Sequence, residues 1–137
     1  MDDLKITPLD PAQRLALEAG LNFAARFASA PRPLSAETVE ALYNAFLEEG
    51  IDDPDAIIAL GLSFGETFLA HGDFEWARVI DEHGEETCLA VIGKAQFCAP
   101  ISMIQKRLAR GEQPDIRLLR EATIELLLGS VEDADDR

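Results

Sequence analysis

Apolar residues recur at helical spacing in five stretches of the chain. In the first, Leu17, Leu21 and Ala24 follow the pair Asp10 and Pro11, an N-cap with proline at the first helical position. The other stretches also begin at a capping residue or a proline, and each ends at or beside a glycine. The pattern therefore predicts five helices, bounded by residues 11–29, 35–50, 54–71, 100–111 and 115–129.

From Phe74 the pattern changes to one that is typical of strands. Residues 74–80 and 87–92 are rich in aromatic and β-branched side chains and are joined by a hairpin loop that contains Gly84, and residues 96–98 follow as a short third strand. Helical periodicity brackets this region on both sides. We expect an α+β fold in which about five helices pack on a small antiparallel sheet of two to three strands.

Length and composition indicate one domain. A chain of 137 residues with 47% hydrophobic side chains buries a sufficient core without metal or disulfide. We expect a single domain over residues 1–137, with residues 1–9 and 129–137 frayed. The N-terminus lacks the pattern of a signal peptide, no apolar run has the length of a membrane span, and two cysteines are too few for a secreted disulfide framework. These features predict a bacterial cytoplasmic protein without membrane contact.

The net charge of the chain limits the classes of partner that it can bind. Acidic residues number 26 against 12 Lys and Arg, which gives a net charge of −14, and such a field repels the phosphate backbone. We therefore expect no nucleic-acid binding. Residues 94–128 carry six basic and four acidic side chains, so the late helices are the segment where a cationic site fits.

Gly61, Gly65 and Glu66 carry the first candidate site. Two glycines four residues apart in a predicted helix favour close approach of another backbone or of a ligand, and packing is the preferred interpretation. Glu66 adjoins this face, where a partly desolvated carboxylate needs a partner. We expect it to pair with Arg107 or Lys106 from the basic segment, as a structural ion pair before a catalytic one.

Other candidate chemistry is weak. Trp76, the single tryptophan, is interpreted as a core residue, with anchoring of a partner as the alternative. His71 and His83 lie next to Asp73 and Glu82, which permits a metal or acid/base pair, but a helix end and a hairpin loop are usually exposed positions, and exposure is the preferred interpretation. Residues 81–86 lack the alternating acids of a calcium loop. No serine lies in a nucleophile elbow and no glycine-rich phosphate loop is present. We therefore expect no metal, no cofactor and no assigned catalytic residue.

The order of Gly61, Gly65-Glu66, Trp76, residues 81–84, and Pro100 with Lys106-Arg107 resembles a family of small bacterial proteins, the domain of unknown function 3806. The resemblance covers about residues 55–110. It implies a shared fold and shared pattern positions, and it implies no substrate.

Three functions fit the sequence. The leading hypothesis is a non-enzymatic binding or regulatory protein that presents an interaction surface to a protein partner, because an acidic field and apolar helices suit a basic or hydrophobic partner. The alternative is an enzyme or small-ligand binder with a site around Glu66, Trp76, Lys106 and Arg107, where the cations would accept a small acidic molecule. The third is a structural homodimer subunit.

Overall fold

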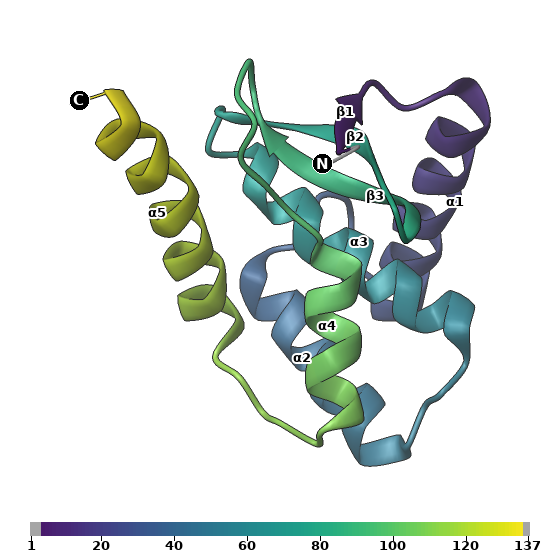
Figure 1. Ribbon diagram of the computed structural model, residues 1–137. Helices are drawn as coiled ribbons and strands as arrows, with labels where there is room; N and C mark the ends of the chain where they lie inside the picture. The colour runs from purple at the N-terminus through teal and green to yellow at the C-terminus, as the bar shows by residue number, and fades with distance from the viewer. Residues whose placement is uncertain (1–3, 136–137) are drawn as a thin grey trace.

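The computed structural model describes residues 4–135, with the backbone alone for residues 130–135. Five helices and four strands follow one another along the chain (Figure 1). In chain order they are β1 (Lys5–Thr7), α1 (Pro11–Ala28), α2 (Ala36–Glu49), α3 (Pro54–Leu69), β2 (Phe74–Asp81), β3 (Gly84–Val91), β4 (Phe97–Cys98), α4 (Pro100–Ala109) and α5 (Ile116–Asp135).

The strands form one antiparallel sheet in the order β1-β2-β3-β4. The α+β fold is confirmed, with four strands in place of the two to three expected. The added strand is β1, which pairs Lys5 with Ile80 at the outer edge of β2. Three residues are too few to show the alternation by which a strand is recognised in a sequence, and this strand falls in the segment to which no element was assigned.

Local signals in the sequence explain where the helices begin and end. The Asp10 side chain accepts a hydrogen bond from the backbone N–H of Gln13, and the Gln13 side chain accepts one from the backbone N–H of Asp10, which makes a capping box at the start of α1. Ser35 caps α2 in a similar way, and Gly50 ends it in the left-handed conformation. The last helix differs from its prediction, because α5 continues past Gly129 to Asp135. Residues 1–3 and 136–137 of the expected frayed ends lie outside the described residues.

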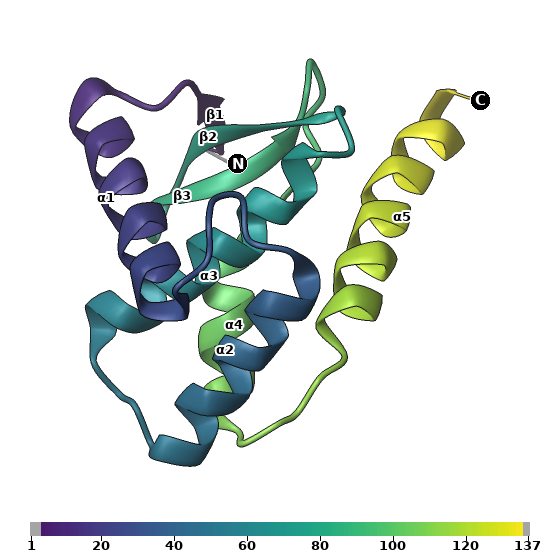
Figure 2. The same cartoon turned by 180° about the vertical axis from the view of Figure 1, so that it is seen from behind.

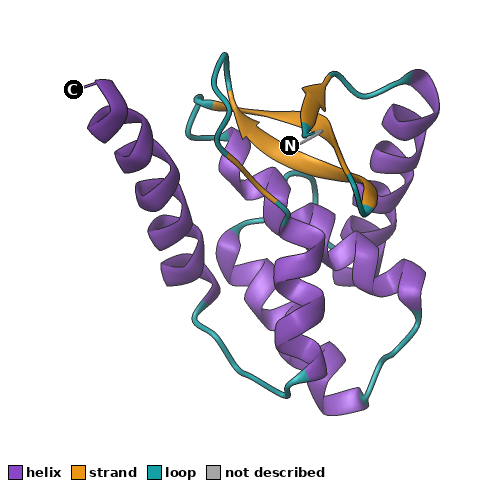
Figure 3. Ribbon diagram, in the orientation of Figure 1, coloured by secondary structure: helices purple, strands orange, loops and turns teal. Residues whose placement is uncertain are grey.

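The central helix is α3, which lies beneath the sheet (Figure 3). Helix α4 lies on one side of α3 and α2 lies on the other, as the two opposite views show (Figures 1 and 2). Phe68 joins this helix to the sheet, because its ring lies edge-on to that of Phe74 of β2, with the ring centroids 5.6 Å apart. Within α3 it also lies edge-on to Phe64, at a centroid distance of 5.3 Å. Such contacts add to the burial energy of aromatic side chains, and the contact with Phe74 packs α3 against β2.

Gly61 and Gly65 let α4 approach α3 closely. A Cβ atom at Gly61 would lie 2.6 Å from Cα of Ile101, and one at Gly65 would lie 2.6 Å from Cη2 of Trp76 and 2.9 Å from Cγ of Pro100. No larger side chain fits either position without movement of its neighbours. The glycines are therefore the point at which α4, α3 and the sheet meet.

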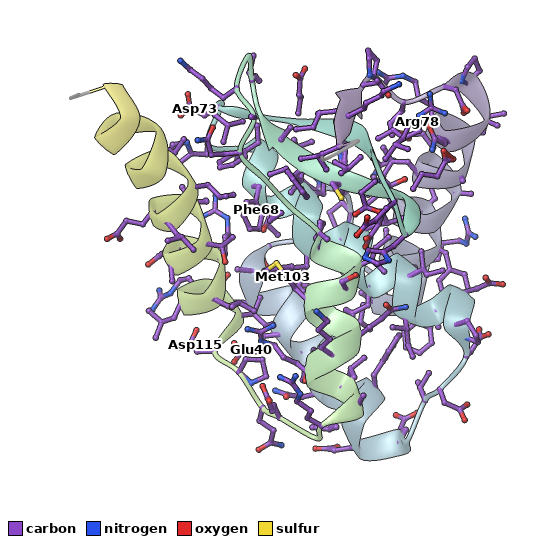
Figure 4. All side chains as sticks on the ribbon, in the orientation of Figure 1. Glu40, Phe68, Asp73, Arg78, Met103 and Asp115 are labelled. Atoms are coloured by element: carbon purple, nitrogen blue, oxygen red, sulfur yellow. The ribbon has the colours of Figure 1, made fainter. Side chains whose placement is uncertain are left out.

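Helix α5 stands at the side of the domain, buries Ile116 and Ile124 in the core, and is held by hydrogen bonds at its first turns. The Glu40 side chain accepts a hydrogen bond of 2.7 Å from the backbone of Ile116, and Asp115 accepts one from Leu118. Glu40 and Asp115 lie together at the start of the helix (Figure 4). One turn further on, Nε of Arg120 donates to the carbonyl oxygen of Thr67 at 3.0 Å, which ties α5 to the last turn of α3.

Candidate functional site

A cleft of about 750 Å³ opens between α3, α5 and the loop that joins α1 to α2, and we call it the α3–α5 cleft. This volume lies within the range of clefts that hold small molecules. Its lining combines the ion pair of Arg32 and Glu66 with apolar side chains such as Leu34 and Leu69, and α5 contributes Arg117 and Arg120. The cleft is the strongest candidate for a functional site in the described part of the chain.

Arg32 lies at the centre of a hydrogen-bond network beside the cleft. Its Nη2 donates to Glu66 at 2.7 Å, and its Nη1 donates to Glu18 at 2.7 Å and to Asn22 at 3.1 Å. The Glu66 side chain is 11% exposed and that of Arg32 is 25% exposed, whereas Glu18 is 58% exposed. One guanidinium therefore connects α1, the following loop and α3, with its more buried contact on Glu66.

The same network sets the charge state of its members. The hydrogen bonds that Arg32 donates to Glu18 and Glu66 raise the pKa of Arg32 further above its already high value, more than burial lowers it. The hydrogen bond from Arg32 lowers the pKa of Glu18. Two buried atoms, Nε of Arg32 and Oε1 of Glu66, have no hydrogen-bond partner among the described residues. Unpaired buried polar atoms are uncommon in folded proteins. Of the three such side-chain atoms among the described residues, two lie in this ion pair beside the cleft, and the third is Oγ of Ser63.

Arg117 and Arg120 are the cations in the cleft that ion pairs do not use. Neither forms an ion pair with a described residue. Arg120 donates a hydrogen bond from its Nε to the carbonyl oxygen of Thr67, which leaves its other two guanidinium nitrogens available. The lining also includes the exposed carboxylates of Glu37 and Glu121. Free guanidinium nitrogens bind carboxylate and phosphate oxygens with well-defined geometry, so this wall of the cleft is suited to an anionic group.

The hydroxyl groups of the lining are already engaged within the protein. Ser35 accepts a hydrogen bond from the backbone of Thr38 and donates one to its side chain. Thr67 donates to the carbonyl oxygen of Phe64 at 2.6 Å. The groups that remain for a ligand are therefore the side chains of the two arginines, together with the carboxylates at the rim.

The predicted partner of Glu66 was wrong. Glu66 pairs with Arg32, and neither Lys106 nor Arg107 forms an ion pair with it. Arg107 instead donates to the carbonyl oxygen of Met103, within its own helix. Glu66 lies one residue past Gly65, so it is turned about 100° around α3 from the face on which α4 packs. A cation on α4 therefore meets the glycine face, and the carboxylate faces the loop.

The structure does not bring the other predicted site residues into the cleft. Trp76 packs between α3 and α4 at Gly65, Lys106 is exposed on α4, and Arg107 is half-buried on the same helix. Only Glu66 of the predicted set lines the cleft. Sequence reasoning missed Arg32, although an arginine between two prolines, one of five basic residues in positions 1–93, was a signal that it has a specific partner.

The thiols of Cys88 in β3 and Cys98 in β4 allow the burial of the sheet to be tested by their reactivity. Burial raises the pKa of each thiol to about 12, from an ordinary value of 9.0. We expect 5,5′-dithiobis(2-nitrobenzoate) at pH 8 to label the folded protein at least about tenfold more slowly than the protein in urea, because the thiolate is the reactive form. Each thiol has a pKa of about 12 in the folded protein and an ordinary value of 9.0 in the unfolded chain. The free energy of unfolding is therefore highest below pH 9 and falls as the pH rises from 9 towards 12. Equal labelling rates in the two states would contradict this assignment.

No helix within residues 4–135 has both the length and the apolar character needed to cross a membrane. Among the side chains that the structure describes, those of residues 4–129, no group of three or more His, Cys, Asp and Glu is placed to hold a metal ion.

Comparison with known proteins gives a family and a fold. No curated protein matches the sequence. A crystal structure from Bacteroides thetaiotaomicron VPI-5482, at 1.50 Å resolution, is similar with a TM-score of 0.73 and 15% identity over 89% of this chain. The match covers 47% of that chain, so this protein spans about half its length, and an identity this low shows the fold alone. A family model matches residues 39–119, more than half of the sequence, and the chain therefore belongs to the family described as Domain of unknown function (DUF3806).

Proposed function

We propose that this protein is a non-enzymatic binding protein that holds a small anionic ligand in the α3–α5 cleft. The observation that carries the proposal is the pair Arg117 and Arg120, whose guanidinium groups line a cleft of about 750 Å³ and form no ion pair with a described residue. A ligand with a carboxylate or phosphate group would complete their hydrogen bonds. The apolar lining would cover the remainder of the ligand.

The arrangement of charges supports binding in preference to chemistry. Arg32 and Glu66 form an ion pair at 2.7 Å, and the hydroxyl groups of the lining bond to nearby protein atoms. A nucleophile needs a general base within hydrogen-bond reach, and no such pair is formed by the residues that line the cleft. The alternative of an enzyme at Glu66, Trp76, Lys106 and Arg107 receives no support from this cleft, because only Glu66 of the four lines it.

Isothermal titration calorimetry with glutamate, succinate and inorganic phosphate would test the proposal. We expect at least one of them to bind the wild-type protein, and Arg117→Gln with Arg120→Gln to weaken that binding by about tenfold or more, since each charge-assisted contact contributes roughly 1.5 to 3 kcal/mol. Arg110→Gln is the matched control, because Arg110 is exposed and lies outside the cleft. Absence of binding by all three anions, or equal losses in the control, would count against the proposal.

A further inference from the structure

An apolar patch, formed by Phe23 and Phe27 of α1 with Ile58 of α3, is exposed at the corner of the domain away from the cleft. The three residues are 37%, 47% and 36% exposed, respectively. The ring centroids of Phe23 and Phe27 lie 6.2 Å apart. Phe27 also lies edge-on to the buried ring of Phe46, at a centroid distance of 5.3 Å. The patch is therefore anchored to the core, and rigid aromatic side chains of this kind are typical of binding sites for proteins.

Helices α1, α2 and α3 meet at this corner. Gly20 lies against Ala59 and Leu62 of α3, so the later turns of α1 run beside the first turns of α3. The two opposite views agree on this arrangement (Figures 1 and 2). The contact between Phe27 and Phe46 places the end of α2 at the same point.

An acidic stretch begins where α2 ends beside the patch. It comprises five exposed carboxylates within eight residues, none of which forms an ion pair with a described residue: Glu48, Glu49, Asp52, Asp53 and Asp55. The last turn of α2 holds no basic residue, so the two glutamates oppose the helix macrodipole without compensation. Like charges at this density also repel one another. Glu48 and Glu49 are thus unfavourable in the isolated protein and would be relieved by a cationic partner, whereas Asp53 and Asp55 lie at the N-terminus of α3, which favours negative charge.

We infer that the apolar patch and the acidic stretch together dock a basic amphipathic helix of a partner protein. The apolar side of that helix would cover Phe23, Phe27 and Ile58, and its lysines and arginines would lie over the acidic stretch. Arg26 is the one basic residue of the last turn of α1, and it leaves the local charge strongly negative. A second copy of the chain fits less well, because a symmetric contact would bring two acidic stretches together.

A synthetic peptide of leucine and lysine, patterned as a basic amphipathic helix and carrying a fluorophore, provides the probe. Anisotropy measured at low salt should show binding to the full chain that weakens as salt is added. We expect Phe27→Ser to weaken binding about tenfold or more, and Asp52→Asn with Asp55→Asn to weaken it severalfold. The charge variants lie on the surface, so they test the site even if Phe27→Ser disturbs folding.

Two matched controls separate this site from general attraction to an acidic protein. Leu15→Ser removes a more exposed apolar side chain from the same helix, at 73% exposure, and Glu82→Gln with Glu85→Gln removes two exposed charges from the β2–β3 hairpin. Both should leave peptide affinity within about twofold of wild type. Equal losses in test and control variants would overturn the inference, as would self-association of the free protein that Phe27→Ser abolishes. Because this site shares no residue with the cleft, either result leaves the anion-binding proposal standing.

Discussion

Replacing Gly61 by alanine is expected to lower the free energy of unfolding by about 2 kcal/mol. The new Cβ would lie 2.6 Å from Cα of Ile101, which is backbone of α4, so the contact is relieved only if that helix moves. Overpacking of this kind costs roughly 1 to 3 kcal/mol, while alanine gains at most about 1 kcal/mol over glycine in a helix interior. Urea unfolding followed by circular dichroism at the helical band measures the difference.

Gly20→Ala is the matched control. It places the same methyl group in the interior of α1, where the nearest atom is Cδ1 of Leu62 at 2.7 Å. The end of a leucine side chain moves more readily than a backbone, so we expect a change within about 1 kcal/mol in either direction. If the two variants lose the same stability, the close approach of α4 is not what Gly61 provides.

Arg32→Ala is expected to destabilise the protein by about 3 kcal/mol, because it leaves the carboxylate of Glu66 without its partner at a site that is 11% exposed. Removal of one member of a buried pair costs about 3 to 5 kcal/mol, and the lower end applies since Arg32 itself is 25% exposed. The double variant with Glu66→Ala should lose clearly less than the sum of the single losses. Thermal and urea unfolding of the three variants measure this coupling.

Glu18→Ala serves as the control within the same network. Its carboxylate bonds the same guanidinium at 2.7 Å but is 58% exposed, so we expect a loss of about 1 kcal/mol or less. Because Arg32 lowers the pKa of Glu18 from 4.5, this contribution is present above pH 4.5 and is lost as the pH falls through the lowered pKa. If the loss of stability in the Arg32→Ala, Glu66→Ala double variant equals the sum of the two single losses, the two side chains are not coupled and the prediction for Arg32 is wrong.

Most of the fold could be predicted from local signals. The pairs Asp10-Pro11 and Asp53-Pro54 precede α1 and α3, Ser35 precedes α2, and the change of period at Phe74 marks β2. What local signals do not contain is pairing between distant segments. The strand β1 exists because Lys5–Thr7 meets β2 more than 70 residues later, and its three residues have no pattern of their own.

The candidate site was predicted less well, for a related reason. The prediction that Glu66 is partly desolvated and paired was correct. The predicted partner, Arg107 or Lys106, was wrong, because it was chosen from the average charge of a segment. Ion pairs depend on which face of a helix each residue occupies. Arg32 comes from a loop between prolines, where periodicity gives no face to assign, so only the folded chain brings it to Glu66.

The short outer strands of the sheet also bear on solubility. The eight-residue strands β2 and β3 lie in the middle, and the edges are occupied by β1 with three residues and β4 with two. Unpaired strand edges are templates for aggregation, and short edge strands that carry lysine, as β1 does at Lys5, discourage such pairing. Edge-to-edge growth of the sheet between molecules is therefore disfavoured.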